Sequence, residues 1–147
     1  MAYRNIVCGV TGSEHSQKAA SEAAKLAKAN GAHLFYVYAV DLTFLKGGKT
    51  GSITSQGVED SLAVMGRHIL DRAEELAAAE GVTPEKLIVK GPVLEVLKKV
   101  VLEKKADLLV LGHEERSFFE KFLVEGEVED HIESLKKETG VEVSVIR

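Results

Sequence analysis

Short apolar runs alternate with longer amphipathic segments along the whole chain. Strands are predicted at the apolar runs Arg4–Val10, His33–Val40, Lys86–Lys90, Asp107–Leu111 and Val141–Ile146. Between them, apolar residues recur at helical spacing, which predicts helices. Strict alternation of strand and helix is typical of an α/β domain. With right-handed crossovers, it gives an open, doubly wound, parallel five-stranded sheet with helices on both faces.

The first predicted helix has clear ends and an unusually small apolar face. Ser13 is placed to cap its start, and Gly31 follows its expected end at Asn30. Its buried stripe consists of small residues, which allow close approach to the sheet: Ala20, Ala23, Ala24 and Ala27.

The later helices carry larger apolar faces. A second helix is predicted at Val58–Glu80, with one face made of Leu62, Met65, Ile69, Ala73 and Leu76. A third follows Pro92, a residue that the first helical turn tolerates, and its buried face is expected to be Val93, Leu94, Leu97, Val100 and Val101. A last helix, Leu123–Thr139, is expected to end before Gly140.

Length and composition indicate one domain, residues 1–147, in the cytoplasm. The length of 147 residues is that of a typical single domain. Cys8 is the only cysteine, so no internal disulfide can form and a reducing compartment is expected. The first five residues lead directly into a strand without a leader-like segment. No apolar stretch approaches the roughly 20 residues of a membrane span, so no membrane association is expected.

The charge distribution argues against nucleic acid as a partner. The chain has 19 basic and 23 acidic residues, a net charge of -4, and no tryptophan. No Lys/Arg cluster stands out, whereas a basic face is the usual mark of nucleic-acid binding.

The segment Asp41–Gly57 is rich in glycine, serine and threonine, and we expect it to be a weakly packed, functional or mobile loop. Within it, Gly47-Gly48-Lys49-Thr50 is similar to the end of a phosphate-binding P-loop. Thr43 stands where the first glycine of that motif belongs, and no helix begins at Thr50. A true P-loop is therefore not predicted.

Neither a catalytic nor a metal site is assigned. His15 is only one or two residues from Ser16 and Ser13, too near in sequence to face either of them on a helix, and the chain has no Gly-x-Ser-x-Gly turn. His15 and His113 are expected near the same end of the sheet, with Glu114 and Glu115 nearby. No short His-x-x-x-His spacing supports a metal site, and a cation-responsive sensor remains only a third functional alternative.

In an open α/β sheet, ligands bind beyond the carboxyl ends of the strands, where the strand order reverses. The turns expected there are Thr11-Gly12-Ser13 and Gly112–Glu115. At this point the chain resembles the universal stress protein family over nearly its whole length. The matching segments are Ile6–Ser16, Gly91-Pro92, Ala106–Gly112 and Val141–Arg147. The resemblance implies the strand order 3-2-1-4-5.

The resemblance also implies a nucleotide pocket, since many members of that family bind ATP. In those members, an acidic residue ends the first strand. A Gly-x-x-Gly after the fourth strand, nine residues, and then Gly-Ser or Gly-Thr hold the phosphates through backbone N–H groups. The candidate pocket residues in this chain are Thr11, Gly12, Ser13, Ala39, Leu111, Gly112, Glu115, Gly126, Glu127 and Val128.

This pocket departs from the family pattern at most of its polar positions. Thr11 replaces the acidic residue, Glu115 the second glycine and Glu127 the hydroxyl residue, while Gly126 is one residue late. Residues 112–130 hold six Glu and one Asp against one Arg and one Lys, a local balance of -5. Each close pair of like charges costs about 4 kcal/mol at an effective dielectric of ~20. Triphosphate binding is therefore disfavoured.

Two functions remain open. The first is a regulatory or binding module similar to universal stress proteins, homodimeric, with no tightly bound ATP or other cofactor and no catalytic residues. The alternative is a stress protein that binds ATP or AMP in a modified pocket and has at most slow ATPase activity. An unidentified protein partner is a further alternative.

The homodimer is predicted from the last strand, Val141–Ile146, which the family's strand order puts at a sheet edge. Val141, Val143 and Val145 alternate on its core face, and the strand has no proline. Such an edge is a template for antiparallel pairing with a second copy. The alternative is a monomer whose edge is protected by Glu142 and Arg147.

Overall fold

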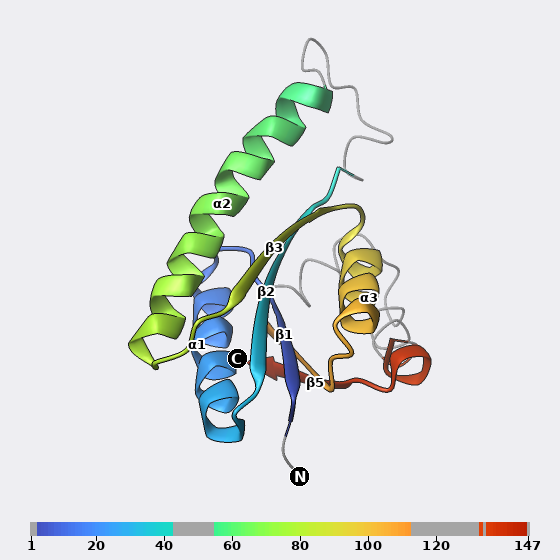
Figure 1. The fold of residues 1–147 in the computed structure, drawn as a ribbon. Coiled ribbons are helices and arrows are strands. Elements are labelled where there is room, and N and C mark those ends of the chain that lie inside the picture. Colours follow the sequence, from blue (N-terminus) through green and yellow to red (C-terminus); the bar gives the residue numbers. More distant parts are fainter. Residues whose placement is uncertain (1–2, 43–54, 113–132, 134, 147) are drawn as a thin grey trace.

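The computed structural model describes residues 3–42, 55–112, 133 and 135–146. All five strands lie parallel in one sheet with the order β3-β2-β1-β4-β5 (Figure 1). Their bounds are β1 Asn5–Gly9, β2 His33–Val40, β3 Glu85–Lys90, β4 Leu108–Gly112 and β5 Glu142–Ile146. The predicted strand order is confirmed, and each predicted strand lies within two residues of its observed ends.

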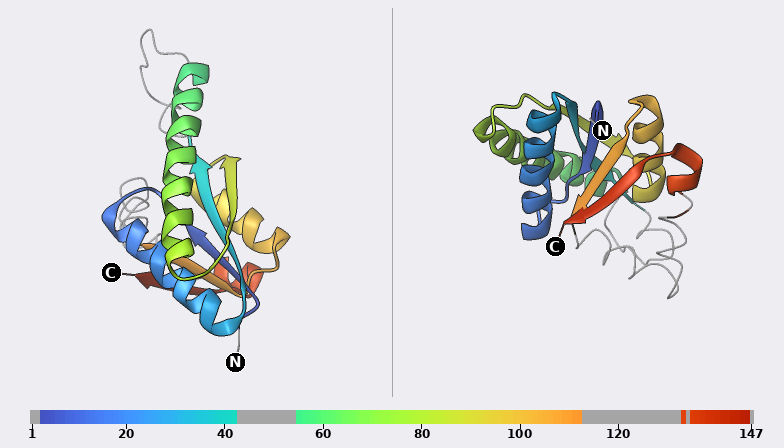
Figure 2. Two further views of the ribbon diagram at one scale, coloured as in Figure 1. Left: turned by 60° about the vertical axis from the view of Figure 1, so that its left-hand side comes forward. Right: turned by 90° about the horizontal axis from the view of Figure 1, so that it is seen from below.

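Helices cover both faces of this sheet, which confirms the doubly wound arrangement. The helices α1 (Glu14–Asn30) and α2 (Ser55–Ala79) lie side by side on one face, and α3 (Val93–Glu103) covers the other (Figures 1 and 2). Residues 135–139 are also helical. Leu135 from this segment is buried with the apolar residues of α3.

Because successive side chains of a strand point to opposite faces, the sheet separates two cores. On β1, Ile6 and Cys8 belong to the core under α1 and α2, and Val7 belongs to the core under α3. Both cores meet the centre of the sheet, where β4 is buried along its whole length and β1 is buried from Ile6 to Gly9. The apolar runs of these strands follow from burial on both faces.

The predicted ends and buried stripe of α1 are confirmed. The Ser13 hydroxyl oxygen accepts a hydrogen bond from the Ser16 N–H at 3.0 Å. Gly31 ends the helix in the left-handed conformation, with φ of 63°, which glycine adopts without a Cβ clash. The alanine stripe is buried, as are Ser16 and Ala19, which the sequence pattern did not single out.

The second helix differs from its prediction in extent and in one face residue. It begins at Ser55, three residues before Val58, and its first turns extend past the end of the sheet (Figure 1). Met65 is 53% exposed instead of buried, whereas Leu62, one turn earlier, packs against the core. Below that point α2 packs closely on β2, because a Cβ on Gly66 would lie 2.4 Å from the Tyr38 ring.

The remaining differences are local. In α3, Val96 is buried although it was not predicted, while Val93 and Leu94 are only partly buried. Most of the predicted loop Asp41–Gly57 and the start of the predicted helix Leu123–Thr139 lie outside the described residues. No helix in the described part of the chain is long and apolar enough to cross a membrane.

Candidate functional site

The carboxyl ends of β1, β2 and β4 meet at one end of the sheet. In the strand register, Gly9 is level with Val37 of β2, and Cys8 is level with Val110 of β4. The candidate residues Thr11, Gly12, Ser13, Ala39, Leu111 and Gly112 are therefore gathered at this end. The candidates Glu115, Gly126, Glu127 and Val128 lie outside the described residues.

These candidates are not equally accessible. Thr11 and Gly12 are exposed, and Ser13 and Ala39 are partly buried. Leu111 is only 2% exposed and belongs to the core under α3, so its side chain is not available to a ligand. Ala39 packs against that same core. Ala39 and Leu111 therefore lie on the α3 side of the sheet.

The turn between β1 and α1 is held by its own hydrogen bonds. The Thr11 N–H donates to the Ser16 hydroxyl oxygen at 2.8 Å, and the Thr11 and Ser13 hydroxyl oxygens are 3.3 Å apart. Gly12 has a φ of 87°, and a Cβ on it would lie 2.9 Å from Ile69 of α2. Both its backbone conformation and its packing therefore require glycine.

Asp41, which sequence analysis did not assign to the site, lies at the same end of the sheet. Its Oδ2 accepts a hydrogen bond at 3.0 Å from the N–H of Val93, the first residue of α3. The Gly91 N–H donates to the Val40 carbonyl oxygen at 3.0 Å, which places the start of α3 beside β2. An acidic residue directly after the second strand was the available clue. Its carboxylate occupies the helix N-terminus, where an anion is stabilised.

A groove between α1 and α2 was also missed. It has a volume of about 260 Å³ and lies on the face of the sheet opposite to Ala39 and Leu111. Its apolar lining is supplied by Val10, Ala20, Met65, Ile69, Ala73 and Leu76. Gly12, Ser16, Gln17, His68 and Arg72 complete the lining. The clue in the sequence was the pair His68 and Arg72 beside the apolar face of the second helix.

The described residues contain no group of three or more His, Cys, Asp or Glu side chains placed to hold a metal ion. His113, Glu114 and Glu115, which the metal hypothesis needs, lie outside the described residues. Cys8 is fully buried under α1 and α2.

Two tyrosines under α1 and α2 have raised pKa values because they are buried. Burial raises the pKa of Tyr36 and of Tyr38 above the ordinary value of 10.0. The Tyr36 hydroxyl donates to the Ala20 carbonyl oxygen at 2.7 Å and so ties β2 to α1.

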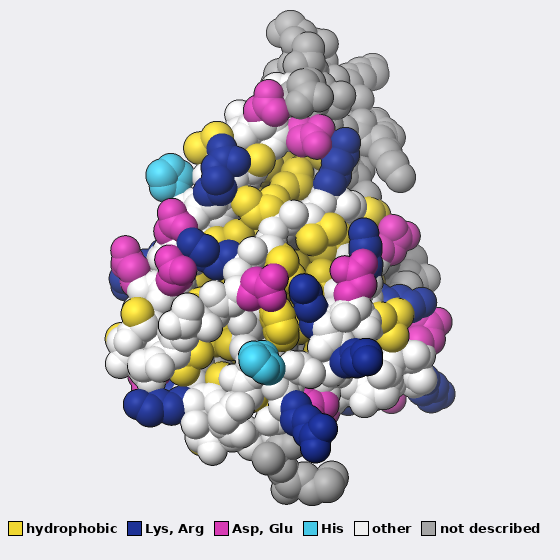
Figure 3. Space-filling view, in the orientation of Figure 1, with side chains coloured by type: hydrophobic (Ala, Val, Ile, Leu, Met, Phe, Trp, Pro, Cys, Tyr) yellow, Lys and Arg dark blue, Asp and Glu magenta, His cyan; other side chains and the backbone are white. Residues whose placement is uncertain are grey.

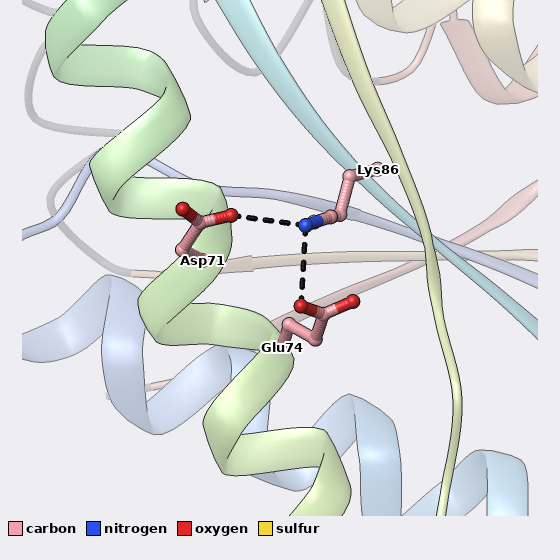
Figure 4. A network of polar contacts seen from close by, with 3 residues as sticks. All are labelled: Asp71, Glu74 and Lys86. Atoms are coloured by element: carbon pink, nitrogen blue, oxygen red, sulfur yellow. Dashed lines mark hydrogen bonds and ion pairs between the residues drawn. The ribbon is translucent and has the colours of Figure 1, made fainter.

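Charged side chains line the β3 edge of the sheet. The Lys86 ammonium lies 2.9 Å from an Asp71 oxygen and 3.2 Å from a Glu74 oxygen (Figure 4). Hydrogen bonds from these two carboxylates raise the pKa of Lys86 above 10.5. Figure 3 shows hydrophobic side chains gathered between α2 and the sheet, bordered by charged groups.

The profile of the universal stress protein family matches residues 2–143. The chain belongs to the universal stress protein family. A universal stress protein crystallised in complex with cAMP has 25% identity and a TM-score of 0.71, with 100% of this chain and 98% of that chain covered. A family member from Burkholderia pseudomallei has 25% identity and a TM-score of 0.73, with 98% and 96% covered.

The universal stress protein from Archaeoglobus fulgidus in complex with dAMP has the same fold. It is 21% identical, with a TM-score of 0.67 and 100% of both chains covered. No curated protein matches the chain in sequence. The fold and family expected from the sequence motifs are thus confirmed for this universal stress protein.

Proposed function

We propose that this universal stress protein is a homodimeric regulatory or binding module that does not bind ATP tightly. The observation that carries the proposal is the Asp41 carboxylate at the N-terminus of α3, 3.0 Å from the Val93 nitrogen. Thr11 stands where the ATP-binding members have an acidic residue, so the site lacks that carboxylate for the nucleoside. The Thr11 N–H already donates to the Ser16 hydroxyl oxygen. A phosphate approaching this end of the sheet meets a fixed negative charge and fewer donors than the family pattern supplies.

The charge of residues 112–130 supports the same conclusion. Their balance of -5 directly follows β4, in the segment where the family pattern holds the phosphates. A triphosphate with its several negative charges is the ligand most disfavoured by such a field.

Calorimetric titration with Mg-ATP tests the proposal directly. We expect a dissociation constant in the high-micromolar range or weaker, and a low-micromolar value would contradict it. In the reverse experiment, the triple variant Thr11→Asp, Glu115→Gly and Glu127→Ser restores the acidic residue, the second glycine and the hydroxyl residue of the family pattern, and it should bind ATP at least about tenfold more tightly, equivalent to ~1.4 kcal/mol. Thr83→Asp, an exposed position between α2 and β3, is the control for added charge.

The second candidate is a universal stress protein that binds a nucleoside monophosphate in the modified pocket. It is favoured by the 25% identity to a universal stress protein in complex with cAMP. A cyclic monophosphate carries one negative charge, so the acidic surroundings repel it less than ATP. Titration with cAMP and AMP beside ATP separates the candidates, because only this second function predicts micromolar binding of a monophosphate. A phosphate-release assay tests for slow ATPase activity.

The proposed dimer interface is the outer side of β5. The Glu142 N–H donates to the Asp107 carbonyl oxygen of the β4 segment at 3.2 Å. In a parallel ladder, alternate residues bond to opposite neighbours, so the N–H groups of Val143 and Val145 point outward. Antiparallel pairing of two β5 strands would satisfy them across a two-fold axis.

A further inference from the structure

The α1–α2 groove is large enough for a small ligand, and Gly12 is the one residue of its lining that also belongs to the predicted nucleotide pocket. Its volume of about 260 Å³ exceeds the ~150 Å³ of a cavity that binds benzene. It is smaller than the ~300–1,000 Å³ typical of sites for drug-sized ligands, which argues against a nucleotide. Val10 faces this groove, whereas Ala39 and Leu111 pack on the other face of the sheet.

Small residues create the space between the two helices. Ala20 on α1 and Ala73 on α2 are both buried and both line the groove. Ile69 and Leu76 on α2 are only partly buried, although they are large and apolar. Met65 is 53% exposed at the open end. These side chains would gain burial if an apolar body filled the groove.

Polar groups in the lining are few, and the charged one is a cation. His68 and Arg72 are four residues apart on α2 and so lie on the same side of the helix. One Arg72 nitrogen is 2.9 Å from a Glu75 oxygen, but both side chains are more than half exposed, which makes this pair weak. The guanidinium has five N–H donors, so it can also bind a second carboxylate.

On α1, the polar lining is already engaged within the chain. The Ser16 hydroxyl oxygen accepts from the Thr11 N–H, and the Gln17 side-chain amide donates to the Gly12 carbonyl oxygen at 3.3 Å. Recognition of a polar head group therefore falls to the α2 side. An arginine favours a planar carboxylate there, because it binds one through two parallel hydrogen bonds.

We propose that the α1–α2 groove binds a small amphipathic carboxylate, such as a medium-chain fatty acid anion. Its apolar tail of about eight carbons lies along Ile69, Ala73 and Ala20, and its carboxylate is bound by Arg72. The ligand touches Gly12 and Ile69, whose packing sets the turn after β1. This site does not depend on the nucleotide site for its ligand, so the two proposals fail separately.

The test titrates the full-length protein with octanoate, while calorimetry and backbone amide NMR shifts are recorded. We expect sub-millimolar binding and shifts in α1 and α2. Octanol, which lacks the charge, and acetate, which lacks the tail, should each bind at least about tenfold more weakly. Arg72→Gln should weaken octanoate binding about tenfold. Arg67→Gln, which removes an exposed arginine outside the groove on the same helix, should leave it unchanged.

A second variant keeps the test independent of the stability of the arginine variants. The chain has no tryptophan, so Met65→Trp places a single fluorescent reporter at the exposed mouth of the groove. Its emission should shift with octanoate and not with acetate. The proposal is overturned if octanoate shows no binding up to about 10 mM, which is tenfold above a dissociation constant of ~1 mM, on the order of the weakest specific binding. It is also overturned if Arg72→Gln binds equally well, or if the shifts map to Ala39 and Gly112.

Discussion

The two edges of the sheet are built from opposite kinds of residues. At the β3 edge, Glu85, Lys86 and Lys90 are exposed and paired with charged groups of α2 and of Lys104, the residue after α3. At the β5 edge, the four residues from Val143 to Ile146 are all partly buried, and the charged residue is Glu142 at the start. Its carboxylate accepts a hydrogen bond from the Tyr3 hydroxyl at 2.5 Å.

This difference indicates which edge is available to a second chain. Lysines on an edge strand discourage pairing, because adding a strand would bury their charge. The β3 edge is protected in this way, although Ile88 in its middle is 38% exposed. The β5 edge has no such protection along its last four residues. The two edges therefore predict that dimers form through β5 and not through β3.

The largest expected effect is loss of the dimer when proline is placed on β5. Val143→Pro removes an outward N–H and leaves the bonds of Glu142 to the β4 segment intact. Ile88→Pro is the matched control. The Gly91 N–H donates to Val40 of β2, so by alternation the Ile88 N–H points away from the sheet.

Sedimentation at protein concentrations of tens of micromolar measures the outcome. We expect dimers for the wild type and Ile88→Pro, and monomers for Val143→Pro. A wild-type monomer at those concentrations contradicts the dimer proposal altogether. If Val143→Pro still forms dimers, the interface lies elsewhere, and the last predicted helix with His131 is the next candidate.

Amide hydrogen exchange compares the β3 and β5 edges as dimer interfaces without any mutation. In a β5-paired dimer, the outward N–H groups of Val143 and Val145 become hydrogen-bonded, and their exchange should slow by at least about tenfold as protein concentration rises through the dimerisation range. The Ile88 N–H should exchange at a rate that does not depend on concentration. Concentration-dependent protection at Ile88 would instead assign the interface to β3.

A buried hydrogen bond within one subunit is expected to have a smaller effect, on the free energy of unfolding. Tyr36→Phe removes the hydrogen bond to the Ala20 carbonyl oxygen and should lower the free energy of unfolding by about 1 kcal/mol in urea titrations. Burial raises the pKa of Tyr36, so its contribution is complete below pH 10 and falls at higher pH as the unfolded tyrosine ionises. The loss caused by Tyr36→Phe should therefore shrink above pH 10. A loss that grows there would be inconsistent with this account.

The smallest effect is expected at the charged edge. Lys86→Ala removes two ion pairs with partly exposed partners, and the urea midpoint should fall only slightly at pH 8. Because the pKa of Lys86 is raised, its stabilising effect is present below about pH 10.5 and is lost as pH rises through the folded-state value. Lys99→Ala, an exposed lysine on α3, is the control and should leave the midpoint unchanged. A large fall for Lys86→Ala would mean that the edge is held by charge.

Much of the fold followed from local pattern alone. Apolar runs at β1 and β4, Ser13 and Gly31 at the ends of α1, and the alanine stripe of that helix all have local causes: burial, capping and side-chain size. Each of these features is contained in one short segment of the chain, so the sequence predicts it. The family motifs Ile6–Ser16 and Ala106–Gly112 are likewise contiguous segments that the sequence shows directly.

The features missed from the sequence join residues that are distant along the chain. Asp41 binds the N–H of Val93, 52 residues away. The α1–α2 groove exists because two helices that are separated by β2 in the chain pack side by side. Met65 is 53% exposed although helical spacing groups it with the apolar residues of α2, because it lines the α1–α2 groove, while the adjacent Gly66 is the residue that packs on β2. The sequence by itself determined which segments fold and which faces they bury, and tertiary packing decided where a ligand finds space and charge.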